Sequence, residues 1–160
     1  MSGSQRIWRI ATQGPSWRAD DLSGTGSADD PGRWNSQGLP VVYASSSISL
    51  SCLETLVHVS GDMGLPLQRW IVAIDIPAEH WKQRNTLKPS DLPYWDATPS
   101  GAASSDWGDR WLNSRTSLLA AVPSVIVPEE CNLLINPRHP ACGLMLATIV
   151  RRWSYDSRLQ

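Results

Sequence analysis

Four residues of types found in active sites occur in this order, at separate places along the chain: Arg33, Tyr43, Glu54 and Ser124. The planar guanidinium of an arginine can hold two phosphate oxygens at once, which the point charge of a lysine cannot copy. A carboxylate can stabilise a positive charge that develops during a reaction. A tyrosine ring and a serine hydroxyl can position a ligand or the carboxylate. The set is typical of an active site.

Each of the four residues also has a purely structural interpretation. Arg33 could stack on Trp34 at the surface, and Glu54 could pair with a surface lysine or arginine. Tyr43 is a good strand residue that could belong to the core, and Ser124 could satisfy backbone groups after Pro123. Residue types alone leave these alternatives open.

The helix expected over Ile48 to Val59 gives Glu54 a direction. Serines at 45–47 offer N-cap hydroxyl groups for this helix. Its helical spacing predicts an apolar stripe formed by Leu50, Leu53 and Val57. At 100° per residue, Glu54 falls about 40° from Leu50, so the carboxylate is expected to face inward or into a cleft.

Alternating and continuous apolar runs predict several strands, which are expected at Gln5–Ala11, Leu39–Ala44, Gln68–Pro77, Leu118–Val127, Asn132–Ile135 and Ala147–Trp153. The run at Gln68–Pro77 is apolar throughout, which indicates a strand covered on both faces. Further helices are expected at Pro77–Gln83 and from a cap at Ser104 or Ser105 to about Arg115. Pro123 and Ser124 interrupt a strand and indicate an edge or a bulge. Residues from Thr12 to Gly38 have no sustained period and are expected to form a long functional loop.

Strands and helices without regular alternation indicate an α+β fold, with a mixed, mainly antiparallel sheet flanked by helices. The 160 residues are expected to form a single domain, 1–160. Fourteen basic and fifteen acidic residues give a net charge of −1, which disfavours nucleic-acid binding. Neither a membrane span nor a secretory signal is recognisable, so we expect a cytoplasmic protein.

Cysteine and histidine spacing predicts no metal site and no disulfide framework. The three cysteines, Cys52, Cys131 and Cys142, form no C-x-x-C pair, and His58, His80 and His139 lie far apart in the sequence. Nine tryptophans occur with no phenylalanine, and most are expected to pack in the core. Trp34 is the exception, because it adjoins Arg33 and could offer a flat face to a heteroaromatic ring.

Several motifs together resemble the RES domain family, which is named for its arginine, glutamate and serine. They are Trp8-Arg9-Ile10, Gly32-Arg33-Trp34-Asn35 with Gly38 and Tyr43, Leu53-Glu54, Val122-Pro123-Ser124, Asn136-Pro137-x-His139-Pro140 and Asp156-x-Arg158-Leu159. The resemblance spans nearly the whole chain in order. It implies a toxin of a bacterial type II toxin–antitoxin module, inhibited by an Xre-like antitoxin that covers the Arg33–Glu54 cleft in a hetero-oligomer. It also implies a fold similar to ADP-ribosyltransferase toxins.

The resemblance implies NAD⁺ as the substrate and assigns Arg33, Tyr43, Glu54 and Ser124 to its site, with Asn136 as a further residue. Cleavage of the nicotinamide–ribose bond releases a neutral ring and creates an oxocarbenium-like sugar cation, which Glu54 could stabilise. The acceptor of ADP-ribose stays open. Water or phosphate would make the protein an NAD glycohydrolase or phosphorylase, and a host protein would make it a mono-ADP-ribosyltransferase.

Two other functions remain possible from the residues alone. Ser124 could be the nucleophile of a hydrolase, with His139 or His58 and Glu54 completing a triad, although no G-x-S-x-G elbow is present. The tryptophans could instead make a non-catalytic binding module. Gly24-Thr25-Gly26 is similar to the start of a dinucleotide fingerprint, but no strand precedes it and no helical pattern follows.

Overall fold

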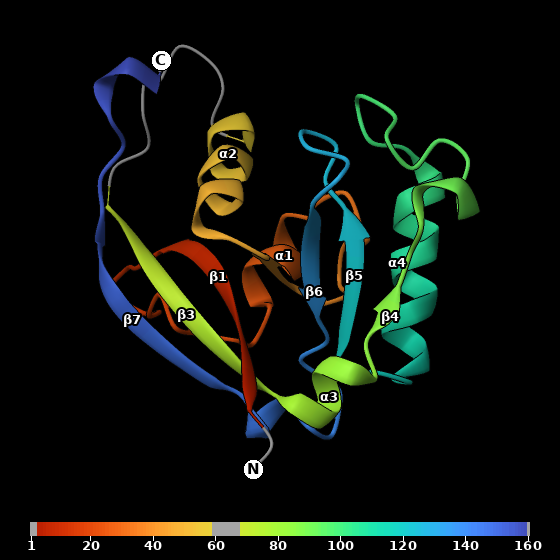
Figure 1. Cartoon of the computed structure of the whole chain (residues 1–160), viewed down its shortest axis with the longest axis horizontal. Coiled ribbons are helices and arrows are strands. Elements are labelled where there is room, and N and C mark those ends of the chain that lie inside the picture. The colour runs from red at the N-terminus through yellow and green to blue at the C-terminus, as the bar shows by residue number, and fades with distance from the viewer. Residues whose placement is uncertain (1–2, 59–67, 160) are drawn as a thin grey trace.

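One mixed sheet of seven strands runs through the computed structural model, which describes residues 3–58 and 68–159 (Figure 1). The strand order is β4-β5-β6-β2-β1-β3-β7. The strands are β1 Ser4–Thr12, β2 Val42–Ser45, β3 Arg69–Pro77, β4 Asn85–Thr86, β5 Leu119–Pro123, β6 Cys131–Ile135 and β7 Leu146–Trp153. The pairing of β4 with β5 is parallel and the other pairings are antiparallel. The expected α+β class with a mixed, mainly antiparallel sheet is confirmed.

The sheet divides between β1 and β2. These strands are joined at the pair Trp8–Ser45, whereas β1 pairs with β3 along its whole length from Ser4 to Thr12. Figure 1 shows β1, β3 and β7 inclined to the strands β5 and β6. The two groups of strands therefore diverge from a single junction.

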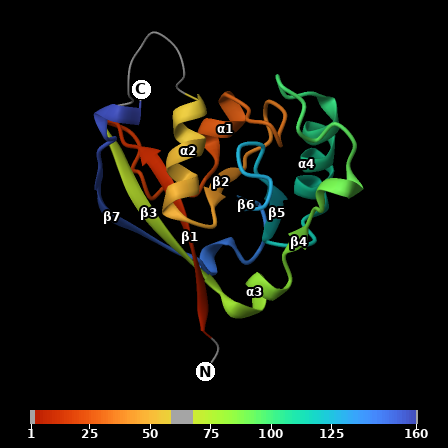
Figure 2. The same cartoon turned by 45° about the horizontal axis from the view of Figure 1, so that its top comes forward.

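Four α-helices accompany the sheet in the described residues: α1 Thr25–Asp29, α2 Ile48–His58, α3 Ala78–Lys82 and α4 Ala102–Ser114. Short 3-10 turns occur at η1 Pro89–Asp91, η2 Cys142–Leu144 and η3 Ser157–Leu159. Helix α2 contacts β1 and β2, and α4 lies beside β4 and β5 at the opposite side of the molecule (Figure 2). None of the helices in the described ranges has the length and apolarity needed to cross a lipid bilayer.

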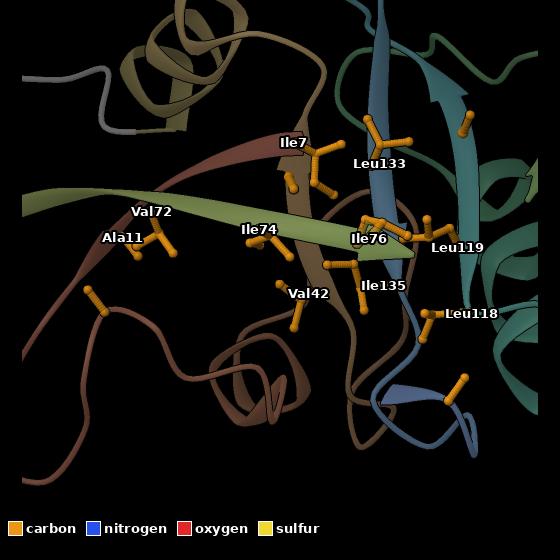
Figure 3. Close-up of a cluster of buried hydrophobic side chains, with 14 residues drawn as sticks. Ile7, Ala11, Val42, Val72, Ile74, Ile76, Leu118, Leu119, Leu133 and Ile135 are labelled. Atoms are coloured by element: carbon orange, nitrogen blue, oxygen red, sulfur yellow. The ribbon is translucent and has the colours of Figure 1, made fainter. Parts of the chain in front are cut away.

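Apolar side chains cover the sheet on both faces. Figure 3 shows the main cluster, in which Ile7, Val42, Ile74 and Ile135 from four strands meet. A second cluster lies under α4 and includes Trp34, Trp95, Trp111, Leu112, Val122 and Leu134. Strand β3 contributes to two clusters, because Ile71 packs beneath α2 while Val72, Ile74 and Ile76 face the main core. The expectation of a strand covered on both faces is confirmed there.

Helix α2 starts as the sequence predicts but buries a different face. The hydroxyl of Ser47 accepts a hydrogen bond from the amide of Leu50 at 3.1 Å, as an N-cap does. Leu50 is 1% exposed, yet Leu53 and Val57 are 39% and 54% exposed, so the predicted stripe is wrong for those two residues. The helix turns Cys52 and Leu56 toward β1 and β3 in their place. Val59 lies outside the described residues.

Other predictions fail for local reasons. Helix α4 begins at Ala102, and Ser104 and Ser105 are inside it, where their hydroxyl groups donate to the carbonyl of Gly101. The long loop from residue 12 to residue 38 contains α1, a helix of five residues. Its Gly- and Ser-rich sequence shows no helical pattern, so the helix was not predicted.

The interruption at Pro123 is a strand end rather than an edge or a bulge. Strand β5 lies between β4 and β6, and its pairs with β6 run in register up to Pro123. The short β4 pairs with Ala120 and Ala121 and stops before the proline. Pro123 is therefore tolerated, because its missing N–H faces no partner strand there. Ser124 follows directly after the strand.

Candidate functional site

A pocket of about 440 Å³ opens where β1 and β2 diverge. It is lined by side chains of β1, β2, β3, β6, α2 and the loop around residues 26–32. Among them are the carboxylate of Glu54, the ring of Tyr43 and two guanidinium groups, those of Arg9 and Arg69. Concave sites that gather a few polar groups in this way are the usual places for small ligands.

Glu54 is fixed by hydrogen bonds to one of its two oxygens. Ser124 Oγ donates to Glu54 Oε1 at 2.8 Å, and Asn132 Nδ2 donates to the same oxygen at 2.7 Å. Ser45 Oγ in turn donates to Asn132 Oδ1 at 2.9 Å. Oε2 of Glu54 receives no hydrogen bond from a residue in the described ranges. One carboxylate oxygen is thus held by the protein and the other is left for a ligand.

The hydroxyl of Ser124 is itself held by the loop that follows β5. It accepts hydrogen bonds from the amides of Ile126 and Val127, each at 3.1 Å. Because its one hydrogen goes to Glu54, Ser124 orients the carboxylate. The expectation that the hydroxyl of Ser124 could position the carboxylate agrees with this geometry.

The segment Gly32 to Asn35 is built around the ring and hydroxyl of Tyr43. The hydroxyl donates to Asn35 Oδ1 at 2.7 Å and accepts from the amide of Trp34 at 3.0 Å. Asn35 Oδ1 also accepts from the amide of Gly32 at 2.9 Å. A Cβ atom at Gly32 would lie 2.7 Å from the Tyr43 ring, so only glycine permits this approach. Burial raises the pKa of the Tyr43 phenol well above its usual value, and the hydroxyl is neutral.

Trp34 is not available to a ligand. Its side chain is 3% exposed and meets Trp107 of α4 edge to face, with ring centroids 5.6 Å apart. Helix α4 approaches so closely that a Cβ atom at Gly108 would overlap the Trp34 carbonyl. The prediction that Trp34 offers a stacking face is therefore wrong, because the close approach of α4 places the ring in the core.

Arg33 lies next to the pocket and holds a distant loop. Its Nη1 donates to the carbonyls of Trp95 and Ala97 at 3.0 and 2.7 Å. Burial lowers the pKa of its guanidinium, and the negative charges of Glu54 and Asp96 oppose that change. Arg33 and Glu54 are thus within electrostatic reach of one another, although Arg33 is not among the residues that line the pocket.

Arg9 and Arg69 are the cations that line the pocket, and the sequence interpretation missed them. Arg9 Nη1 donates to the carbonyl of Tyr43 at 3.0 Å. The Nε atoms of both arginines are buried, and neither has a hydrogen-bond partner in the described part of the chain. Burial lowers the pKa of Arg9; Asp21 opposes that shift and Arg69 adds to it. One signal was present in the sequence: Arg9 interrupts an apolar strand between Trp8 and Ile10.

Asn136 has a structural position instead of a place in the pocket. Its Nδ2 donates to the carbonyl of Leu112 at 2.9 Å, which ties the end of α4 to the turn after β6. Its Oδ1 accepts from the amide of Arg138 at 3.1 Å, and the side chain is fully buried. The structure therefore does not bring Asn136 together with Glu54 and Tyr43.

The geometry does not support a serine-hydrolase triad: His58 lines the Glu54 pocket, but neither His58 nor His139 forms a hydrogen bond with Ser124 in the described part of the chain. Ser124 gives its hydrogen to Glu54, and His139 Nδ1 accepts from the amide of Ala141 at 3.0 Å. The ring of His139 meets that of His80, with centroids 6.0 Å apart. Within residues 3–58 and 68–159, no group of three His, Cys, Asp or Glu side chains is arranged to hold a metal ion.

Comparisons with known proteins agree with the motifs. The family model described as "RES domain" matches residues 6–157. "Prs ADP-ribosylating toxin" of Sphingobium sp. (strain YBL2) is 49% identical over 154 residues, which cover 96% of this chain and 95% of that protein. "Toxin Res" of Yersinia enterocolitica is 37% identical over 144 residues, covering 89% of this chain and 92% of that protein.

A solved structure shares the fold. It is the toxin–antitoxin complex MbcT-MbcA of M. tuberculosis, matched with a TM-score of 0.55 and 16% sequence identity over 94% of this chain and 86% of that one. At that identity the likeness concerns the fold alone. The family match over nearly the whole chain and two close relatives lead to one conclusion: the chain belongs to the RES domain family.

Proposed function

We propose that this RES-domain chain is a bacterial toxin that binds NAD⁺ in the Glu54 pocket, cleaves the nicotinamide–ribose bond and transfers ADP-ribose to an acceptor. One observation carries the proposal. Glu54 lies in a pocket with two arginines, and only one of its carboxylate oxygens is hydrogen-bonded to the described residues. Relatives that are 49% and 37% identical bear the names "Prs ADP-ribosylating toxin" and "Toxin Res". Residues 1–160 act as one unit in this proposal.

The reaction makes one main demand on the protein. Nicotinamide leaves NAD⁺ as a neutral ring and takes the electron pair of the broken C–N bond, so no acid is needed on the leaving group. The ribose carbon is left as an oxocarbenium-like cation. Oε2 of Glu54 can accept a hydrogen bond from a ribose hydroxyl and stabilise that cation more than the ground state, which is the condition for catalysis. Ser124 and Asn132 keep the carboxylate in place through Oε1.

Tyr43 supplies its ring to the substrate. Its hydroxyl is already used by Trp34 and Asn35, so a hydrogen bond from this hydroxyl to the ribose is disfavoured. The ring lines the pocket, and a flat aromatic face suits stacking on nicotinamide. Tyr43 therefore orients the leaving group.

The phosphates of NAD⁺ suit Arg9 and Arg69. The two guanidinium groups repel each other in one pocket, and their buried Nε atoms have no hydrogen-bond partner among the described residues. An anion would relieve both costs. Arginine also binds phosphate oxygens in a bidentate manner. Arg33, expected from the sequence to hold the phosphates, has one nitrogen committed to the carbonyls of Trp95 and Ala97. We assign Arg33 to the site as a group that fixes this loop and adds positive charge near Glu54.

The acceptor proposed is a host protein. The support is the relative named "Prs ADP-ribosylating toxin", which is 49% identical to this chain over almost its full length. Water and phosphate are the competing acceptors, and each would give NAD⁺ depletion instead. The chain is proposed to act in the cytoplasm under the control of an antitoxin of the Xre type that covers the pocket. Support for a partner comes from the shared fold with the toxin of the MbcT-MbcA toxin–antitoxin complex.

One assay tests the reaction and its acceptor together. The purified protein is incubated with NAD⁺ labelled in the adenine ring and with cell extract, and nicotinamide release is followed in parallel. We expect nicotinamide to appear together with label bound to protein. Label found entirely in ADP-ribose or its 1-phosphate would replace the protein acceptor by water or phosphate. Absence of nicotinamide release would refute the proposed function.

A further inference from the structure

A second hollow, of about 1100 Å³, lies beside the Glu54 pocket and shares Arg9 and Gly26 with it. Its lining comes from the end of β1 and the following loop and helix, residues 11–29. Neither Glu54 nor Tyr43 lines this hollow. Arg9 therefore stands at the boundary between a pocket that contains the catalytic carboxylate and a wider groove that does not.

The shape of a dinucleotide explains this arrangement. The pyrophosphate lies at the middle of NAD⁺, with nicotinamide riboside on one side and adenosine on the other. If the nicotinamide ribose lies against Glu54 and Arg9 holds the pyrophosphate, the adenosine must leave Arg9 on the side away from Glu54. We infer that the groove lined by residues 11–29 binds the adenosine half of NAD⁺, an inference that rests on the proposed function.

Trp17 is the residue of this groove that suits a purine ring. Trp17 is 49% exposed, and the other eight tryptophans of the chain are all less exposed. The ring packs against Gly14, where a Cβ atom would lie 2.3 Å from a ring carbon. The indole Nε1 of Trp17 donates to Thr12 Oγ1 at 3.2 Å, and the backbone carbonyl of Trp17 accepts from the amide of Gly14 at 3.0 Å. A ring held on one side and open on the other is a stacking platform for a base.

Carboxylates in the groove suit the adenosine ribose. Asp21 is close enough to Arg9 to oppose the lowering of its pKa by burial, and it accepts from the hydroxyl of Ser23 at 2.6 Å. The carboxylate of Asp29 in α1 also lines the groove, and it makes no hydrogen bond or ion pair with another side chain of the described ranges. Carboxylates are acceptors for ribose hydroxyl groups. The groove thus offers a ring for the base and acceptors for the sugar.

An acceptor protein does not fit this groove equally well. The acceptor must reach the ribose carbon that loses nicotinamide, and that carbon lies beside Glu54. The groove begins at the far side of Arg9, where the proposed arrangement has no reacting atom. A protein that docks there would approach the wrong end of the dinucleotide.

Binding measurements separate the two halves of the ligand without requiring catalysis. Isothermal titration with ADP and with nicotinamide mononucleotide is carried out on the wild-type chain, on Trp17→Ala and on Trp17→Phe. We expect Trp17→Ala to weaken ADP binding roughly tenfold, because base stacking on an aromatic ring is lost, and to leave nicotinamide mononucleotide binding unchanged. Trp17→Phe keeps a stacking ring and should retain most of the ADP affinity. ADP should quench tryptophan fluorescence in the wild type. This quenching should be smaller in Trp17→Phe, which lacks the indole ring at that position.

The outcomes are distinct. Equal ADP affinity in the wild type and Trp17→Ala overturns the inference, and so does an equal loss of affinity for both ligands. Gly14→Ala, which displaces the ring without removing it, should also weaken ADP binding. If Trp17→Ala lowered protein labelling at unchanged ADP affinity, the groove would be an acceptor-docking surface and the inference would be wrong. Because ADP binding does not depend on bond cleavage, failure of the NAD⁺ assay above and failure here are separate results.

Discussion

The hydroxyl of Ser124 lies 2.8 Å from Oε1 of Glu54, although the two residues are 70 positions apart in the chain. The contact joins the residue that follows β5 to the middle of α2, and of the two residues only Glu54 lines the pocket. Asn132 of β6 donates to the same oxygen. The carboxylate is therefore oriented by the half of the sheet opposite to the one that carries Arg9 and Arg69.

Ser124→Ala tests whether this serine orients the carboxylate or acts as a nucleophile. The variant removes one of two hydrogen bonds to Glu54, and such bonds to charged groups are worth about 1.5–3 kcal/mol. We expect the rate of nicotinamide release to fall about tenfold, with activity still measurable because Asn132 remains. Complete loss in a folded variant would point to a nucleophile. Ser100→Ala changes an exposed serine and serves as the control.

The same variant should be less stable than the wild type. Ser124 Oγ is the acceptor for the amides of Ile126 and Val127, and both amides lose it on substitution. Buried donors left without an acceptor cost about 1–3 kcal/mol, and Ile126 and Val127 are half-buried, so the expected loss lies at the lower end of that range. Thermal melting in the absence of ligand checks this expectation, and an unchanged midpoint would contradict the role of Ser124 as the acceptor for that loop.

Arg33→Lys is expected to lower kcat/KM for NAD⁺ by about tenfold or more. Nη1 of Arg33 joins the carbonyls of Trp95 and Ala97, and a lysine ammonium on a shorter side chain cannot keep both contacts and the planar fork. The loop around residue 96 should shift as a result. Steady-state kinetics against Arg110→Lys, an exposed arginine of α4, measures the effect. Kinetics equal to those of the control would remove Arg33 from the site.

Arg9→Met is expected to separate ligand binding from stability. The Nε of Arg9 is buried without a partner in the described residues, and its charge lies close to that of Arg69. Loss of a charge-assisted contact to phosphate should raise the Kd for NAD⁺ roughly 10–100-fold. The melting temperature of the unliganded protein should not fall, because removal of a buried charge that has no ion pair among the described residues offsets the loss of its hydrogen bond to the Tyr43 carbonyl. Titration and melting of the same sample give both quantities, and a destabilised variant with normal NAD⁺ affinity would reverse the interpretation.

The sequence predicted those features that depend on local periodicity. The direction of Glu54 followed from its angle to Leu50, and Glu54 does face the pocket. The same periodicity was wrong for Leu53 and Val57, because the face of a short helix that becomes buried depends on which strands it meets.

Features that depend on strand order were not predictable from a single sequence. Arg9 and Arg69 come together because β1 lies between β2 and β3, and Asn132 reaches Glu54 because β6 pairs with β2. Nothing in the spacing of these residues specifies that order. Trp34 was misassigned for a similar reason, since the close approach of Gly108 in α4 decides that its ring is buried.

Nicotinamide release by Glu54→Gln tests the central claim most directly. The amide keeps the shape of the side chain and removes the negative charge that is proposed to stabilise the sugar cation. Glu79→Gln, a change at an exposed position of α3, is the control. We predict that Glu54→Gln lowers kcat on the order of 10²–10³ while NAD⁺ still binds. A kcat within about twofold of the control variant would contradict the proposed role of the Glu54 carboxylate in catalysis.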